Sequence, residues 1–148
     1  MSFQNPVFIP GPTNIPEKLR KACDMPTIDH RSPLFGQILR PVRDGVRRIL
    51  QSNSAEVFIF PSTGTGGWET ALTNTLSAGD GVLAARTGMF SHRWIDMCQR
   101  HGLVVTIVDT PWGVGLQAEP YAEVLTADTG PRHNAVLAPD TEHPQGVT

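Results

Sequence analysis

The residues that could do chemistry gather in one short stretch, Ser62-Thr63-Gly64-Thr65-Gly66-Gly67, which combines hydroxyl groups with glycine. Four apolar residues at 57–60 precede it and are typical of a short buried strand. One face of a helix follows, at Trp68, Ala71, Leu72, Thr75 and Leu76. A strand, a turn of small residues and a helix start direct free backbone N–H groups and the positive end of a helix dipole at one point. The stretch therefore predicts a seat for an anion such as a phosphate group.

Spacing excludes three common motifs that this stretch partly resembles. A P-loop ends in Gly-Lys followed by Ser or Thr, whereas Trp68 follows Gly67 here. A dinucleotide fingerprint needs a third glycine where Glu69 stands, and we expect Glu69 to complement the helix dipole instead. A nucleophile elbow needs the pattern Gly-x-Ser-x-Gly, which Gly64-Thr65-Gly66 does not supply. The remaining alternative is a tight turn whose glycines only permit close packing, and spacing alone leaves it open.

Apolar runs and helical patterns alternate along the rest of the chain and must position this seat. We expect further strands at 82–85, 103–108 and 135–138. We expect helices at 17–23, from residue 34 with an interruption or a kink near Pro41, after 87–91 up to Gly102, and at 119–125. The strands are continuously apolar, which is typical of parallel strands that helices cover on both faces. The predicted fold class is α/β with a mostly parallel sheet.

The composition narrows the class of protein. The chain has 148 residues, of which 39% are hydrophobic and 18% charged, which is enough for one domain with a core. Its net charge of -2 gives no electrostatic reason to expect nucleic acid. Neither a signal peptide nor an apolar run long enough to span a membrane is apparent. Cys23 and Cys98 are isolated, so we expect two buried or half-buried thiols in the cytoplasm, with no disulfide and no metal site.

Four motifs stand out in order: Gly11-Pro12-Thr13-Asn14-Ile15-Pro16, Asp29-His30-Arg31-Ser32-Pro33, the segment 60–69 continued by Thr73-Asn74-Thr75-Leu76, and the segment 88–94. From about residue 5 to residue 138 the chain resembles the class V aminotransferases that use pyridoxal 5′-phosphate, within them the serine–, alanine– and aspartate–glyoxylate group. The resemblance implies the N-terminal part of the large domain of a fold-type-I transferase. Residues 1–35 would form an N-terminal arm and short helix, and residues 36–148 a partial cofactor-binding domain.

The resemblance also implies cofactor contacts. The backbone and hydroxyl groups of Thr63, Gly64 and Thr65 would hold the cofactor phosphate, where the turn already predicts an anion. Phe90 would stack on the pyridine ring, the alternative being a plain core aromatic. His143 aligns with a hydroxyl-bearing residue that contacts the phenolic oxygen of the cofactor, and a histidine there could still donate a hydrogen bond.

On the substrate side, the resemblance places Gly11 and Asn14 near the substrate. His30 and Arg31 could reach the active site of a partner subunit, because the family is similar to obligate homodimers with shared sites. The alternative for His30 and Arg31 is a structural hydrogen-bonding element. The implied reaction moves an amino group from a small amino acid (serine, alanine or aspartate) to glyoxylate, with neither nucleic acid nor membrane as a partner.

The family's Schiff-base lysine has no counterpart here. The chain contains only Lys18 and Lys21, which match no lysine motif of the family. The aspartate and arginine that the family uses for the pyridinium nitrogen and the substrate carboxylate are also missing, so we expect an N-terminal fragment that is inactive alone. The alternative is a non-catalytic anion-binding or interaction module with the same fold. A class V desulfurase fits less well, because the motifs match the glyoxylate group.

Overall fold

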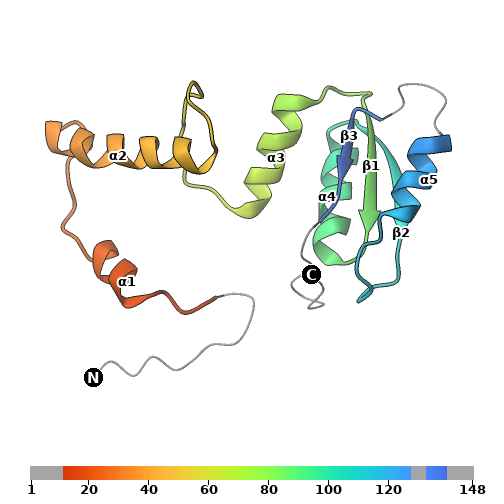
Figure 1. Cartoon of the computed structure of the whole chain (residues 1–148), viewed down its shortest axis with the longest axis horizontal. Coiled ribbons are helices and arrows are strands. Elements are labelled where there is room, and N and C mark those ends of the chain that lie inside the picture. The colour runs from red at the N-terminus through yellow and green to blue at the C-terminus, as the bar shows by residue number, and fades with distance from the viewer. Residues whose placement is uncertain (1–11, 128–132, 140–148) are drawn as a thin grey trace. The chain divides into compact units, whose positions relative to one another are not determined.

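The computed structural model describes residues 12–127 and 133–139 of the chain (Figure 1). The chain divides into two compact units, Met1–Pro61 and Ser62–Thr148, and each is described by itself. The division that the sequence predicts near residue 35 stays a prediction. Among the described residues, no helix combines the length and the apolar character needed to cross a bilayer.

The described residues of the first unit form two helices, α1 (Glu17–Cys23) and α2 (Pro33–Ile49). Helix α2 begins at a proline in its first turn, and the Ser32 hydroxyl before it accepts the N–H of Phe35 at 3.4 Å. Helix α2 is not interrupted at Pro41, because it is continuous from end to end, and the alternative of a kink there stays a prediction. A proline removes one N–H donor, and complete helical turns on both sides of Pro41 keep their own hydrogen bonds.

Residues 57–60 do not form the strand that their composition predicts. The side chains of Phe58 and Phe60 are 76% and 78% exposed. A strand needs a neighbouring strand for its backbone hydrogen bonds, and within the described ranges no strand pairs with this segment. The residues that lead up to it are held on α2, because Arg43 pairs with Glu56 at 2.7 Å.

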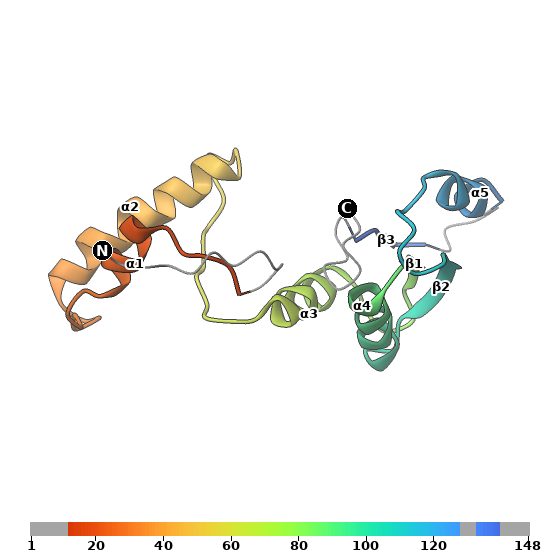
Figure 2. The same ribbon diagram turned by 90° about the horizontal axis from the view of Figure 1, so that it is seen from below.

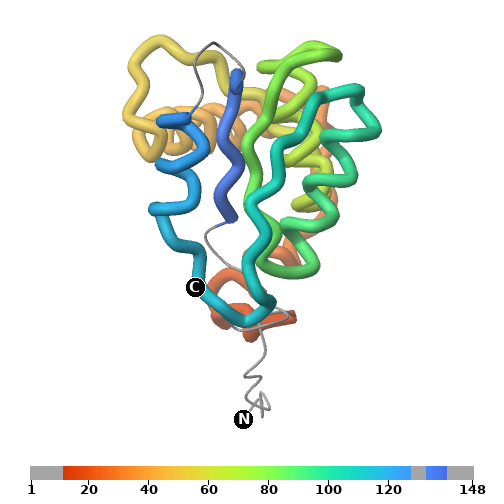
Figure 3. The backbone as a smooth tube through the Cα atoms, turned by 90° about the vertical axis from the view of Figure 1, so that its right-hand side faces the viewer, coloured from red at the N-terminus to blue at the C-terminus, as the bar shows by residue number. Residues whose placement is uncertain are grey.

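The second unit is a parallel sheet with helices. Its elements are α3 (Gly64–Thr75), β1 (Gly81–Arg86), α4 (Met89–Arg100), β2 (Val104–Asp109), α5 (Glu119–Ala127) and β3 (Ala135–Leu137). The strands lie in the order β2-β1-β3 and all pairs are parallel, as the backbone tube in Figure 3 shows. The predicted α/β class is therefore confirmed, with helices in place of loops between successive parallel strands.

The core of this unit lies on both faces of β1. On one face, Val82 packs with Leu72 of α3 and Cys98 of α4. On the other face, Leu83 packs with Tyr121 of α5. Figure 2 shows α4 and α5 on opposite sides of the strands. Alternating side chains of one strand thus face two helical layers, as expected for a buried parallel strand.

The two cysteines lie in different surroundings. Both are free thiols, and Cys98 is buried in α4, as predicted. Cys23 is exposed, so the prediction that it is at least half-buried is wrong. The reason is that α1 has no buried residue at all. Among the described residues, no group of His, Cys, Asp and Glu could hold a metal ion.

Candidate functional site

The start of α3 has the geometry of an anion seat. Thr63 precedes the helix in extended conformation, and its Oγ1 accepts the N–H of Gly66 at 3.3 Å. The carbonyl oxygen of Thr63 accepts the N–H of Gly67 at 3.2 Å, which is the first helical hydrogen bond. The N–H groups of Gly64 and Thr65 precede that bond and have no partner within the helix. Hydroxyls and free N–H groups thus meet at the positive end of the α3 dipole.

The alternative reason for the glycines of this turn, close packing, accounts for only some of them. A Cβ atom added to Gly66 would overlap Ser62 Oγ, so Gly66 does allow a close approach. A Cβ on Gly64 or Gly67 would meet nothing within 4 Å among the described residues. Close packing therefore explains one glycine of three. Bare backbone at Gly64 is what a phosphate-binding turn needs, because the ligand approaches the N–H groups directly.

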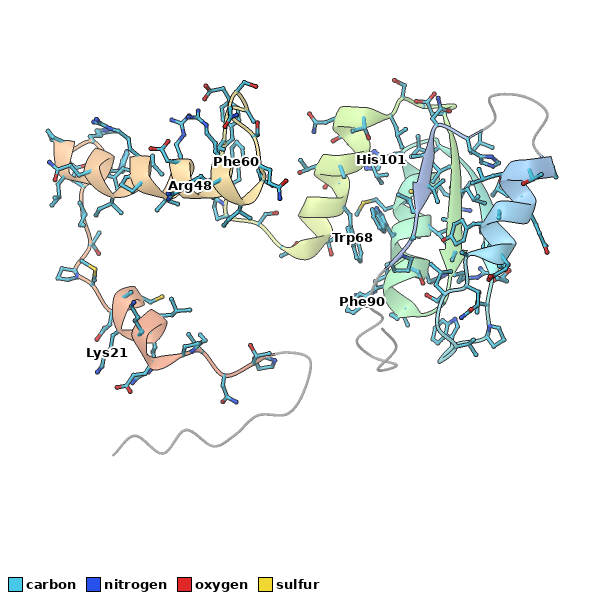
Figure 4. The ribbon with its side chains drawn as sticks, in the orientation of Figure 1. Lys21, Arg48, Phe60, Trp68, Phe90 and His101 are labelled. Atoms are coloured by element: carbon cyan, nitrogen blue, oxygen red, sulfur yellow. The ribbon has the colours of Figure 1, made fainter. Side chains whose placement is uncertain are left out.

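An aromatic cluster, Trp68, Phe90 and Trp94, joins the starts of α3 and α4. Trp68 stacks on Trp94 with ring centroids 5.4 Å apart and an interplanar angle of 15°. Trp68 also meets Phe90 edge-on, with centroids 6.2 Å apart and an angle of 69°. Such offset and edge-to-face arrangements are the favoured ones for aromatic rings. Figure 4 shows Trp68 and Phe90 at the same end of the sheet, so the predicted phosphate seat and the predicted ring contact lie in one region.

Ser91 fixes the turn that carries Phe90, a role that sequence reasoning missed. Its buried Oγ accepts the N–H groups of Thr87 and Gly88, both at 3.0 Å, and donates to the Gly88 carbonyl at 3.0 Å. A hydroxyl at the third position of a helix that returns to the backbone before it is a capping arrangement. The signal was present in the spacing of Gly88 and Ser91. The turn is thereby held in one conformation on either side of Phe90.

One ion pair lies at the carboxyl ends of β1 and β2. Arg86 and Asp109, at the carboxyl ends of β1 and β2, form a two-pronged ion pair with distances of 2.6 and 2.8 Å. The hydrogen bond to Asp109 raises the pKa of Arg86, and the same bond lowers the pKa of Asp109.

No acidic residue lies in the first turn of α3. The expected role of Glu69 at the helix start is wrong, because α3 begins at Gly64 and Glu69 instead lies 3.8 Å from His101.

The predicted substrate-side residues belong to the first unit. Asn14, His30 and Arg31 are all exposed. The Arg31 N–H donates to Asp29 Oδ1 at 2.9 Å, and His30 Nδ1 lies 3.9 Å from the same oxygen. These contacts form a local turn, in line with the structural alternative, and a substrate role for the three residues stays a prediction. Gly11 and His143 lie outside the described residues.

Several known proteins that are similar to this chain are named as aminotransferases. The chain is 67% identical over 147 residues to the L-aspartate–glyoxylate aminotransferase of Paracoccus denitrificans, which covers 99% of this chain and 37% of that protein. It is 44% identical over 145 residues to the serine–glyoxylate aminotransferase of Methylorubrum extorquens, covering 98% and 36%. The crystal structure of an alanine–glyoxylate aminotransferase from Nostoc sp. has a TM-score of 0.67 and 27% identity, covering 80% and 31%. No protein-family model matches.

Over nearly its whole length the chain is therefore homologous to the class V aminotransferases, and its parallel α/β fold is theirs. Within that class, its similarity is to the glyoxylate aminotransferases. The chain spans about a third of the length of these relatives.

Proposed function

We propose that this chain holds the phosphate and the ring of pyridoxal 5′-phosphate in an aminotransferase that uses glyoxylate as amino acceptor. The observation that carries the proposal is the joint placement of the α3 start and Phe90 through the aromatic contact of Trp68. A phosphate group and an aromatic ring are the two ends of this cofactor. An anion seat beside an aromatic side chain matches both of them.

The donor set of the site fits a phosphate group. Thr63 and Thr65 offer hydroxyl groups, and Gly64 and Thr65 offer backbone N–H groups at the positive end of the α3 dipole. The first turn contains no carboxylate that would repel the anion. Phe90, half-buried in the first turn of α4, would bound one face of the ring. In this proposal the residues of the chain bind and orient the cofactor.

When bound, the cofactor supplies an electron sink for the amino-acid substrate. The chain's two lysines match no lysine motif of the aminotransferases that the chain resembles. Lys18 and Lys21 both lie on α1 in the first unit, and Lys21 pairs with Glu17 at 2.9 Å. We therefore propose that binding and orientation reside in this chain, and that turnover needs a lysine that this chain does not contain.

Aspartate, serine and alanine are the amino donors that the names of the relatives suggest. We propose aspartate as the first donor to test, because the relative with 67% identity is named for it. A homodimer is the assembly that we propose for the active enzyme, and the cytoplasm is its compartment.

The proposal is tested by comparing pyridoxal 5′-phosphate with pyridoxal, which lacks the phosphate group. Quenching of tryptophan fluorescence reports binding, because Trp68 lies beside the proposed site. Thr65→Ala should weaken pyridoxal 5′-phosphate binding about tenfold through loss of one hydrogen bond to a charged group. Thr73→Ala is the matched control, because Thr73 lies on the same helix and its hydroxyl donates only to the Glu69 carbonyl, at 2.8 Å. Equal affinity for the two ligands, or equal loss in both variants, would contradict the proposal.

A further inference from the structure

The central strand β1 ends differently on its two sides. Its pairing with β2 continues to the last residues, Arg86 opposite Asp109. Its pairing with β3 stops at Ala84 opposite Leu137. Among the described residues, the carboxyl edge of the sheet is therefore paired between β1 and β2 and unpaired between β1 and β3. This edge is where α4 begins and where Phe90 lies.

Tyr121 of α5 occupies the position at which the β1–β3 pairing stops. Its hydroxyl accepts the N–H of Ala85 at 2.9 Å and donates to the carbonyl oxygen of Leu137 at 2.8 Å. The direction of both bonds is fixed, since a backbone N–H only donates and a carbonyl oxygen only accepts. The residue is 8% exposed, and burial raises the pKa of its phenol, so the hydroxyl keeps the proton that it donates. One side chain thus satisfies the two backbone groups that a continued ladder would have paired.

On its other side, the end of β1 is held against β2. Arg86 Nε and Nη2 reach the two carboxylate oxygens of Asp109 at 2.6 and 2.8 Å. The N–H of Thr110 also donates to the Arg86 carbonyl at 3.3 Å. Because two-pronged arginine–carboxylate pairs fix geometry as well as charge, β1 and β2 remain together at this edge. The opening is confined to the β1–β3 side.

Hydrogen bonds hold the backbone at two successive places between the end of β1 and Phe90. Tyr121 holds the N–H of Ala85, and two residues later the N–H groups of Thr87 and Gly88 are held by Ser91 Oγ. Phe90 lies within the turn that Ser91 closes. A shift of β1 toward β3 would therefore carry this turn with it.

We infer that Tyr121 is a positioning residue: its hydroxyl keeps the sheet open between β1 and β3 and sets where Phe90 stands for the cofactor ring. The inference rests on the proposed function. It assigns a role to Tyr121 of α5, which belongs neither to the anion seat nor to the aromatic cluster. The ion pair of Arg86 and Asp109 holds the end of β1 against β2, and the Tyr121 hydroxyl separates the ends of β1 and β3.

The test uses the full chain with Tyr121→Phe, which keeps the ring and removes the hydroxyl. Val124→Ala is the matched control, because Val124 lies on the same helix and packs on the same cluster but makes no strand contact through a polar atom. Binding of pyridoxal 5′-phosphate and of inorganic phosphate is measured for each variant, together with amide hydrogen exchange. Tyr121→Phe should weaken pyridoxal 5′-phosphate about tenfold. It should leave inorganic phosphate unchanged, because the seat on α3 is untouched.

Hydrogen exchange separates this inference from the proposed function. In Tyr121→Phe, exchange should change at Ala85 and in the turn 87–90, and Val124→Ala should leave both as in the original chain. Loss of both ligands in equal measure, or the same loss in Val124→Ala, would mean that Tyr121 is merely structural and would overturn the inference. If the original chain binds neither ligand, the proposed function fails. The positioning of the Phe90 turn is then judged by exchange alone, and unchanged exchange in Tyr121→Phe overturns it.

Discussion

The hydroxyl of Thr63 is the side-chain group that organises the anion seat, and its removal has a calculable cost. Thr63→Ala deletes the acceptor for the Gly66 N–H, which now lies 3.3 Å from Oγ1. The backbone bond from the Gly67 N–H to the Thr63 carbonyl survives, because it does not involve the side chain. Only the first turn of α3 should therefore loosen.

Replacing a threonine N-cap by alanine typically costs about 1 kcal/mol of stability. The bond at Thr63 is long and the residue is exposed, so the lower half of the usual range applies. A loss of about 1 kcal/mol should lower the urea midpoint by about 0.5 M. Phosphate affinity should fall as well, because a frayed first turn no longer presents the N–H groups of Gly64 and Thr65 together.

The assay is urea unfolding followed by tryptophan fluorescence, with inorganic phosphate binding measured on the same samples. Thr63→Ser is the control, because serine keeps the Oγ acceptor and should restore both stability and phosphate affinity. Two results would refute the reasoning. In one, Thr63→Ala matches the original chain in both assays. In the other, Thr63→Ser loses as much as Thr63→Ala.

Three further outcomes follow from the geometry. Since the hydrogen bond from Arg86 lowers the pKa of Asp109, this pair stabilises the fold above the pKa of an unfolded aspartate, about 4, and the contribution is lost as pH falls through the lower folded pKa. Urea unfolding at neutral and acidic pH should therefore show a smaller acid loss in Asp109→Asn. Burial raises the pKa of the Cys98 thiol, so mass spectrometry should find a thiol reagent on exposed Cys23 first and on Cys98 only after unfolding; early labelling of Cys98 would contradict its burial. Leu83→Ala, at a fully buried position of β1, should cost about 2–5 kcal/mol in urea unfolding, and a loss below 1 kcal/mol would contradict the packing.

Local sequence patterns correctly predicted the strands that have a neighbouring strand to pair with. Strands β1, β2 and β3 fall where apolar runs are flanked by turns, and α4 ends before Gly102, whose φ of 76° suits glycine. Residues 57–60 are apolar as well, but no strand lies beside them in the described parts of the chain. The composition of a segment indicates that it can form a strand. It does not report whether a partner is present.

The candidate site was predictable in part. The turn at 63–65 could be read from the sequence, because glycines, hydroxyls and a helix start are local features. The contact of Trp68 with Phe90 joins two helices, and nothing in their spacing predicts that the rings meet. The two hydrogen bonds of Tyr121 to Ala85 and Leu137 are equally hidden, because they depend on the strand order. Pairing across the sheet is a property of the fold and not of a motif.

The central claim is that the start of α3 holds the phosphate of pyridoxal 5′-phosphate while Phe90 meets its ring. Amide chemical shifts of the full chain, followed as pyridoxal 5′-phosphate is added, test it most directly. The account predicts that the N–H signals of Gly64 and Thr65 move together with those around Phe90, and that inorganic phosphate moves only the first pair. Shifts confined to α1, where Lys18 and Lys21 lie, would contradict it.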